Sequence, residues 1–230
     1  MTGPTDWDFA DVGNVLFEIP KRSKPPFKNH TQTVTPFYIK ASSDSAKDNG
    51  AYGACIFANT AGAGAPNPDG YVYVYGIHGL NKDVVVARVK PAEFRQFDQW
   101  RFFDGKDWSI DMAKAATVAD STSNEMSVTP MPDGRYAMVF QVNGMSPYVG
   151  VRIGKTPYGP FGKVINIWSC DEVNIVPGKS YTYNAKAHPH WSKPGELLIS
   201  YNVNSFDFYN VIKTHPDLYR PRFIKLKFQE

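Results

Sequence analysis

Two histidines flank a proline in the segment "YTYNAKAHPHWSKPGELLISYN", residues 181–202. If this segment is a strand, its period of two directs Lys186, His188 and His190 to one face. Two imidazoles on one face could contact a single ligand, and an imidazole can donate a proton near neutral pH. A zinc site would need a third ligand, which no spacing supplies, so we expect no metal or other cofactor. We expect His188 to contact a substrate or to take part in acid–base chemistry, with a hydrogen-bonded structural role as the alternative.

Several residues are of the kinds that bind sugars. Amide and hydroxyl groups match the hydroxyl groups of a sugar, and an aromatic side chain can stack on the C–H face of its ring. For each of them, an ordinary place in the core or on the surface of a tyrosine-rich β-protein is the alternative. The candidate substrate-binding residues are Asn59, His78, Tyr183, Asn184, His190 and Trp191.

The segment around His188 has two relatives earlier in the chain. Residues 52–79, 124–144 and 185–204 each combine a short strand, a turn containing proline and glycine, and a stronger strand. Proline fixes φ and glycine accepts positive φ, so these turns suit tight hairpins. Asp69 and Asp133 stand in two of the turns, and turn chemistry is a sufficient reason for both.

Further strands follow the hairpins in a constant order. A four-stranded antiparallel sheet that recurs about every 60–70 residues is typical of a β-propeller. A β-sandwich, the main rival, would give short strands but no reason for this order. Arg88 and Arg152 hold matching places on third strands, which indicates a repeated structural role such as pairing between blades. Third strands are predicted at 83–91, 148–154 and 222–228, and fourth strands at 99–105 and 163–169.

The sequence therefore predicts an all-β fold, a β-propeller with four-stranded antiparallel blades, in a single domain over residues 1–230. Residues 109–121 have only a weak apolar stripe, so at most a turn or two of helix is expected there. Residues 1–51 should supply part of a further blade, with strands at 14–20 and 33–41. The blade-like units are expected at about 52–108, 124–169 and 183–228.

Charge and hydropathy narrow the classes of partner. The net charge of +3 is spread along the chain without a basic run, so nucleic acid is not an expected partner. No apolar stretch approaches the length of about 18 residues that spans a membrane, and the amino terminus lacks the regions of a signal peptide. We expect no membrane partner, and the localisation stays open: it is extracellular or periplasmic if a signal peptide has been removed.

Five segments carry a family resemblance: "APNPDGYVYVYG" (65–76), "VVARV" (85–89), "EMSVTPMPDGRY" (125–136), "TPYGPFG" (156–162) and "YNAKAHPHWSKPGELLISYN" (183–202). In order and spacing they resemble the five-bladed propeller glycoside hydrolases, and within that group a secreted microbial family known only as a domain of unknown function. Some members of that family are implicated in cleaving arabinan-type polysaccharides. "TPYGPF" is also similar to a turn of arabinanase and β-xylosidase-like propellers.

The resemblance implies a glycoside hydrolase that acts on a polysaccharide or oligosaccharide, such as an arabinan, in the central cleft. It implies that Glu125, which opens the innermost strand of the middle unit, is a catalytic acid or base, with His188 assisting in the same cleft. Glycoside hydrolysis requires a second carboxyl group beside the first. The alternative is a non-catalytic carbohydrate-binding or structural propeller that has lost the carboxylate pair.

The sequence departs from the resembling family near its amino terminus. Propellers of that family are about one blade longer there, and a strand rich in glycine and aspartate carries a first catalytic carboxylate. Asp6, Asp8 and Asp11 instead cluster in "TDWDFADVG", which is typical of an exposed edge or turn. We therefore expect an incomplete ring that lacks the first blade. Its open blade edges should lead to self-association.

Overall fold

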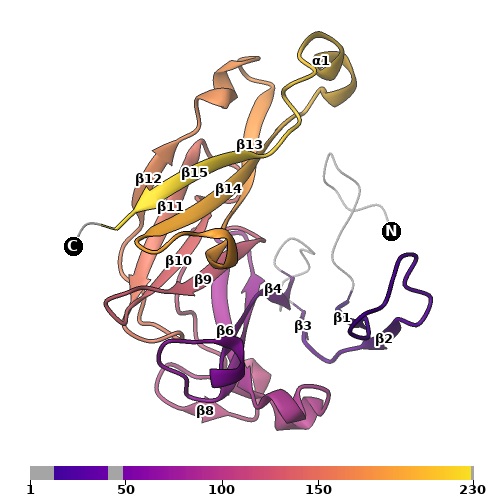
Figure 1. Ribbon diagram of the computed structural model, residues 1–230, viewed down its shortest axis with the longest axis vertical. Helices are drawn as coiled ribbons and strands as arrows, with labels where there is room; N and C mark the ends of the chain where they lie inside the picture. The colour runs from indigo at the N-terminus through magenta and orange to yellow at the C-terminus, as the bar shows by residue number, and fades with distance from the viewer. Residues whose placement is uncertain (1–12, 41–48, 229–230) are drawn as a thin grey trace.

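The computed structural model describes residues 13–40 and 49–228, which form antiparallel sheets joined by turns and short helices (Figure 1). The prediction of an all-β fold is confirmed. Three sheets follow one another along the chain, from the first at the bottom of Figure 1 to the third at its top. Asp6, Asp8 and Asp11 lie outside the described residues.

The first sheet has six strands in the order β3-β4-β5-β6-β7-β8. Its central strands are almost entirely buried, which agrees with their nearly continuous apolar sequences, YVYVYGIH and DVVVARV. The first hairpin therefore forms as predicted, with the third and fourth strands beside it. The strands are β3 (Tyr38–Ile39), β4 (Gly50–Asn59), β5 (Tyr71–His78), β6 (Asp83–Val89), β7 (Arg101–Phe103) and β8 (Trp108–Ser109).

The second and third sheets repeat the hairpin and the strand that follows it. The second sheet has the order β12-β11-β10-β9, and the third has the order β13-β14-β15. The second sheet contains β9 (Met126–Pro130), β10 (Tyr136–Gln141), β11 (Tyr148–Gly154) and β12 (Ile165–Ser169). The third contains β13 (Ser180–Ala187), β14 (Glu196–Ser205) and β15 (Arg222–Lys227). Among the described residues β15 has no partner on its outer side, where the other two sheets have a further strand.

The first strands of the three hairpins lie side by side, with β4 against β9 and β9 against β13. The Ser127 hydroxyl of β9 accepts a hydrogen bond of 2.7 Å from the backbone N–H of Ala187 in β13. Gln141 Nε2, at the end of β10, donates to Thr182 Oγ1 at 3.0 Å. Adjacent innermost strands with the other strands stacked outward are consistent with a β-propeller.

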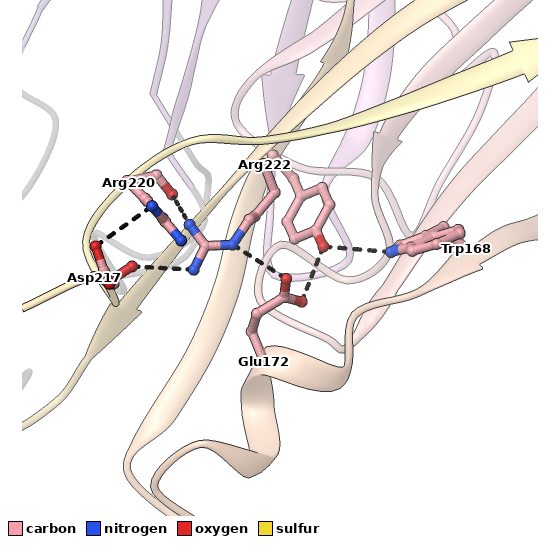
Figure 2. Close-up of polar contacts among 6 residues, drawn as sticks. Trp168, Glu172, Asp217, Arg220 and Arg222 are labelled. Atoms are coloured by element: carbon pink, nitrogen blue, oxygen red, sulfur yellow. Dashed lines mark hydrogen bonds and ion pairs between the residues drawn. The ribbon is translucent and has the colours of Figure 1, made fainter. Parts of the chain in front are cut away.

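A chain of hydrogen bonds links the third sheet to β12 of the second sheet and to the short helix that follows β12 (Figure 2). Trp168 Nε1 donates to the Tyr201 hydroxyl at 3.3 Å, and that hydroxyl donates to Glu172 Oε2 at 2.9 Å. Arg222 Nε donates to the other Glu172 oxygen at 3.2 Å. Burial raises the pKa of Tyr201, and its hydrogen bond to Glu172 adds to the rise. The hydroxyl therefore stays protonated as a donor, which suits a structural contact.

The amino-terminal strands depart in part from the expectation of outer blade strands. β1 (Val15–Glu18) and β2 (Thr31–Val34) pair only with each other, in a two-stranded sheet. β3, from the same predicted segment as β2, instead pairs with the start of β4. The hairpin is held to the first sheet by a few polar contacts, such as Asn14 Nδ2 to the Tyr52 carbonyl at 2.5 Å.

Short helices fill the connections. Residues 109–121 contain a single 3₁₀ turn, as expected. The seven-residue helix α1 (Phe208–Thr214) was not predicted; it buries Val211. The 3₁₀ helices are η2 (Ala61–Ala63), η3 (Pro91–Glu93), η4 (Phe97–Gln99), η5 (Met112–Lys114), η6 (Asp171–Asn174) and η7 (Pro189–Trp191).

Candidate functional site

One face of the third sheet packs on the second sheet, and the other face is open. Alternate residues of β14, such as Leu197, Ile199 and Tyr201, are buried in the core that the two sheets share. The residues between them are half-buried, and no further sheet packs over them in the described part of the chain. By the strand register, the open face carries Tyr181, Tyr183, Lys186, Glu196, Leu198, Ser200, Asn202, Asn204, Phe223, Lys225 and Lys227. We call these residues, with His188, the outer face.

Aromatic rings and amides alternate across one end of the outer face. Tyr181 is directly opposite Asn204, and Tyr183 is directly opposite Asn202. The ring centroids of Tyr181 and Tyr183 are 5.6 Å apart, and Phe206 lies 4.5 Å from Tyr181. These are flat apolar surfaces beside hydrogen-bonding groups, the combination that holds a sugar ring.

Strand β13 contains a bulge beside the aromatic end of the outer face. The register of β13 against β14 shifts between Tyr183 and Lys186, and Asn184 within the shift has φ +62°. Positive φ is uncommon outside glycine, although asparagine tolerates it better than most residues. The Asn184 Oδ1 atom is also buried, with no hydrogen-bond partner among the described residues. A strained backbone and an unsatisfied acceptor at one residue are features that cluster at functional sites.

The first sheet contains the same bulge with a different residue. The register of β4 against β5 shifts between Tyr52 and Cys55, and Gly53 takes the positive φ there, at +116°. The two stretches read "YGA" and "YNA". The bulge is therefore a repeated feature of the fold, and the asparagine side chain is particular to the third sheet.

Glu125 lies next to the aromatic end of the outer face. It is exposed and comes directly before β9, so the expectation that it opens this innermost strand agrees with the structure to within one residue. Burial, the Tyr219 side chain and smaller effects of the charges of Tyr181 and Glu125 raise the pKa of Tyr183 to about 12. Glu125 directly precedes β9, which packs along β13, the strand that carries Tyr183. In the described part of the chain the Glu125 carboxylate forms no hydrogen bond or ion pair.

His188 lies at the other end of the outer face, just after β13. One ring nitrogen, Nε2, is 2.7 Å from Ser200 Oγ, and the ring stacks on Trp191 with centroids 5.3 Å apart. Burial and, second, the charge of Lys186 lower the pKa of His188. A neutral imidazole that is hydrogen-bonded to a serine and covered by a tryptophan is compatible with either interpretation of His188, ligand contact or structural support.

His190 does not share the face of His188, because the strand ends before the two residues. Pro189 has no backbone N–H and begins the 3₁₀ helix η7, which turns His190 into an exposed position. Trp191, in the same helix, is 73% exposed. The period-of-two argument for the two histidines is therefore wrong.

A family model described as "Domain of unknown function (DUF5005)" matches residues 2–228. The chain belongs to this family. No curated protein matches the DUF5005 chain. A crystal structure of a "putative hydrolase" from Bacteroides ovatus shares its fold, with 24% identity, a TM-score of 0.55, and a match over 76% of this chain and 44% of that one.

The DUF5005 chain thus spans less than half the length of the Bacteroides protein. A second solved structure, an α-L-arabinofuranosidase from Clostridium thermocellum, gives a TM-score of 0.34 and 11% identity. That match covers 69% of the DUF5005 chain and 53% of the other.

The remaining sugar-binding candidates of the DUF5005 chain lie away from the outer face. Asn59 ends β4 and is only 2% exposed, so its side chain lies in the core, where its Oδ1 atom has no hydrogen-bond partner among the described residues. His78 ends β5 and pairs with Asp83 across the next turn. The structure thus brings Tyr183, Asn184 and Glu125 together, with His188 and Trp191 at the far end of the same sheet.

Four polar residues have structural surroundings. Asp69 and Asp133 each accept a hydrogen bond of 3.0 Å from the backbone N–H two residues later, which is the expected turn chemistry. Arg152 forms an ion pair of 2.6 Å with Asp120. Arg88 instead lies over the rings of Tyr71 and Trp108, 4.3 Å and 4.1 Å from their centroids. The matched arginines therefore share a place in the repeat but differ in chemistry.

Two cavities of the DUF5005 chain lie off the outer face. A cavity of about 530 Å³ lies between the β1–β2 hairpin and β4, and Tyr52, Trp100 and Asn124 are among its lining residues. A second, of about 400 Å³, lies where the hairpin turns meet, and it is lined largely by prolines. Neither contains Glu125 or His188, so a cleft shared by these two residues stays a prediction.

The described residues contain neither a metal-binding cluster nor a membrane-spanning helix. No three His, Cys, Asp or Glu side chains gather there in a way that could hold a metal ion. No helix within residues 13–40 and 49–228 is long and apolar enough to cross a membrane.

Sequence reasoning missed most of the outer face and named only Tyr183 and His188 as site residues. Tyr181, Asn202, Asn204 and Phe223 were not among the candidates, although a period of two relates the first to Tyr183 and the next two to each other. This period could have grouped them. Which face of the strand stays open depends on the packing of the sheets, and the local sequence does not carry that information.

Proposed function

We propose that this DUF5005 chain acts on a polysaccharide as a glycoside hydrolase-like protein, binding the glycan on the outer face and presenting Glu125 to it. The observation that carries the proposal is that the exposed Glu125 directly precedes β9, the strand packed against β13, and that β13 carries aromatics opposite amides on its open face. The fold is shared with a protein described as a hydrolase. A shared fold does not assign an activity, so the proposal depends on these side chains.

In this proposal Glu125 supplies one half of the hydrolytic chemistry. A glycosidase protonates the leaving oxygen with one carboxyl group and uses a second as base or nucleophile, about 5–9.5 Å away. Glu125, exposed to solvent and free to approach a bound sugar, takes the acid or base role. A five-bladed ring that lacks its first blade, and secretion to where polysaccharides occur, belong to the same proposal.

The second candidate function is carbohydrate binding without catalysis. One specific observation favours it: the aromatic end of the outer face consists of rings and amides, with no carboxyl group among the paired residues Tyr181, Tyr183, Asn202 and Asn204. The outer face would then hold the glycan, and Glu125 would accept hydrogen bonds from its hydroxyl groups.

Reducing-end release from arabinan, xylan and galactan separates the two functions. In a hydrolase, Glu125→Gln keeps the shape of the side chain but removes its ionisable proton, so turnover should fall about a hundredfold or more while binding persists. His188→Ala should reduce turnover less. Glu93→Gln, on the 3₁₀ helix η3 of the first sheet, is the matched control and should leave turnover unchanged.

Binding is measured with the same glycans by calorimetry. Tyr183→Ala removes the central ring of the aromatic end and should weaken binding about tenfold, since a stacked ring contributes about 1 kcal/mol or more. Binding without any cleavage would select the second candidate. If the parent protein neither binds nor cleaves any of these glycans, and no charged glycan either, the proposed function is wrong.

A further inference from the structure

The outer face carries an excess of positive charge. Lys186 lies opposite Ser200, Lys225 opposite Leu198, and Lys227 opposite Glu196. Among the residues that pair across β13, β14 and β15, Glu196 is the one acid, and its carboxylate lies 3.9 Å from Lys225 Nζ. On the three strands, three lysines therefore face a single carboxylate, with Glu125 as one further acid at the margin of the face.

The sequence that contains these strands also has more basic than acidic residues. Residues 179–228 carry eight Lys and Arg against three Asp and Glu, a net charge of +5 in a chain whose total is +3. The remainder of the chain is therefore slightly acidic. A surface of one sign concentrates ligands of the opposite sign and speeds their association.

The charges are spaced for an extended ligand. Lys186 and Lys225 lie two strands apart and two residues apart along the strands, about 10 Å across and about 7 Å along. Phe223, which is 58% exposed, lies on β15 two residues from Lys225, and Ser200 of β14 separates it from Lys186. An apolar ring beside two separated cations suits a chain of linked units more than one small anion.

We propose that the ligand of the outer face is an anionic polysaccharide, one whose sugar units carry acidic groups. This rests on the proposed glycan binding and narrows its class. The lysines pair with the acidic groups, while Phe223 and the tyrosines contact the sugar rings. Neutral glycans would make only the contacts with Phe223 and the tyrosines, and they would bind more weakly for that reason.

The test compares two probes of equal length, an oligogalacturonate and a neutral galacto-oligosaccharide, by calorimetry at low and at physiological ionic strength. We expect the oligogalacturonate to bind roughly tenfold or more tightly than the neutral probe, and its affinity to fall as salt is added. The double variant Lys186→Gln, Lys225→Gln should reduce the preference to about twofold or less, because it removes both charge contacts.

The control is the double variant Lys114→Gln, Lys163→Gln, which changes the net charge equally at exposed positions of the first and second sheets. It should keep the preference for the anionic probe. Equal loss in this control, or equally tight binding of polyglutamate, would mean that general charge attraction suffices, and the inference would fail.

Each of the remaining outcomes refutes part of the account. Equal affinity for the two probes would refute the inference that the glycan is anionic, but it would leave the proposed glycan binding in place. If neither probe binds, both the proposed function and this inference are wrong. A molecular mass that doubles with concentration and blocks probe binding would assign the outer face to a second copy of the chain.

Discussion

Replacing Asn184 by glycine should stabilise the protein, an unusual result for a substitution in a strand. Asn184 holds φ +62° in the β13 bulge, and its Oδ1 atom is buried without a partner among the described residues. Glycine takes positive φ without steric cost, and it removes the unsatisfied acceptor. In the first sheet, glycine already occupies the equivalent bulge position, as Gly53.

The expected gain follows from two opposing effects. A buried acceptor without a donor costs about 1–3 kcal/mol, and glycine costs about 0.5–1 kcal/mol through the greater freedom of the unfolded chain. The free energy of unfolding should therefore rise by about 1 kcal/mol, which for a chain of this size raises Tm by about 2–4 °C. Asn184→Ala also removes the acceptor but keeps a Cβ at positive φ, so it should be about 1 kcal/mol less stable than the glycine variant.

Urea denaturation followed by tryptophan fluorescence measures these differences. Gly53→Ala is the companion experiment: its Cβ would meet only Asn14 Nδ2 at 3.8 Å, so any loss of stability reports the backbone alone. An Asn184→Gly variant less stable than the parent, or an alanine variant as stable as the glycine one, would refute the argument from strain. In the proposed function the Asn184 side chain serves the bound glycan, so the glycine variant should also bind glycan more weakly.

Three further outcomes are expected. Glu172→Gln weakens the bonds to Arg222 and Tyr201 and should lower the free energy of unfolding by about 1–2 kcal/mol. Glu196→Gln should cost less than about 1 kcal/mol, because its ion pair with the exposed Lys225 is 3.9 Å long. Equal losses in urea titrations would contradict the role of the Glu172 contacts. Because burial and Lys186 lower the pKa of His188, its contribution to stability is present above the unfolded-state pKa of 6.5 and is lost as the pH falls below it. His188→Gln should flatten the dependence of stability on pH between about pH 7 and 5, and an unchanged slope would speak against this. Self-association stays a prediction: β15 is an unpaired edge in the described residues, so light scattering should show a mass that rises with concentration, and a constant monomer mass would contradict it.

The hairpins and the strands after them could be predicted because their signals are local. The prolines and glycines of the turns, such as Gly70 at φ +82° and Gly134 at φ +83°, fix the reversals of the chain wherever the sheets pack. Strands β6 and β11 are apolar enough to be recognised without a partner. The helix α1 has no side-chain capping bond and only one buried residue, so its sequence gives little indication of it.

The site could be predicted only in part, because its residues depend on features without a local signal. Tyr183, Asn184 and Trp191 were chosen for their chemistry, and Glu125 for its place in the repeat. Pro189 begins a 3₁₀ helix, so the period of two failed between His188 and His190. The bulge at Asn184 shifts the alternation of β13 by one residue, so Tyr183 and Lys186, three residues apart, share one face. Asn59 has the right chemistry but lies in the core, since the packing of the first two sheets covers the end of β4.

Hydrogen–deuterium exchange with and without bound oligosaccharide tests the central claim most directly. Binding on the outer face should slow amide exchange in β13, β14 and β15 and in the residues around Glu125, because the ligand covers these strands and steadies their edges. The strands β5 to β8 of the first sheet should exchange at the same rate in both samples. Protection centred on the first sheet or on the cavity beside the β1–β2 hairpin, with the third sheet unchanged, would contradict the assignment of the outer face as the glycan site.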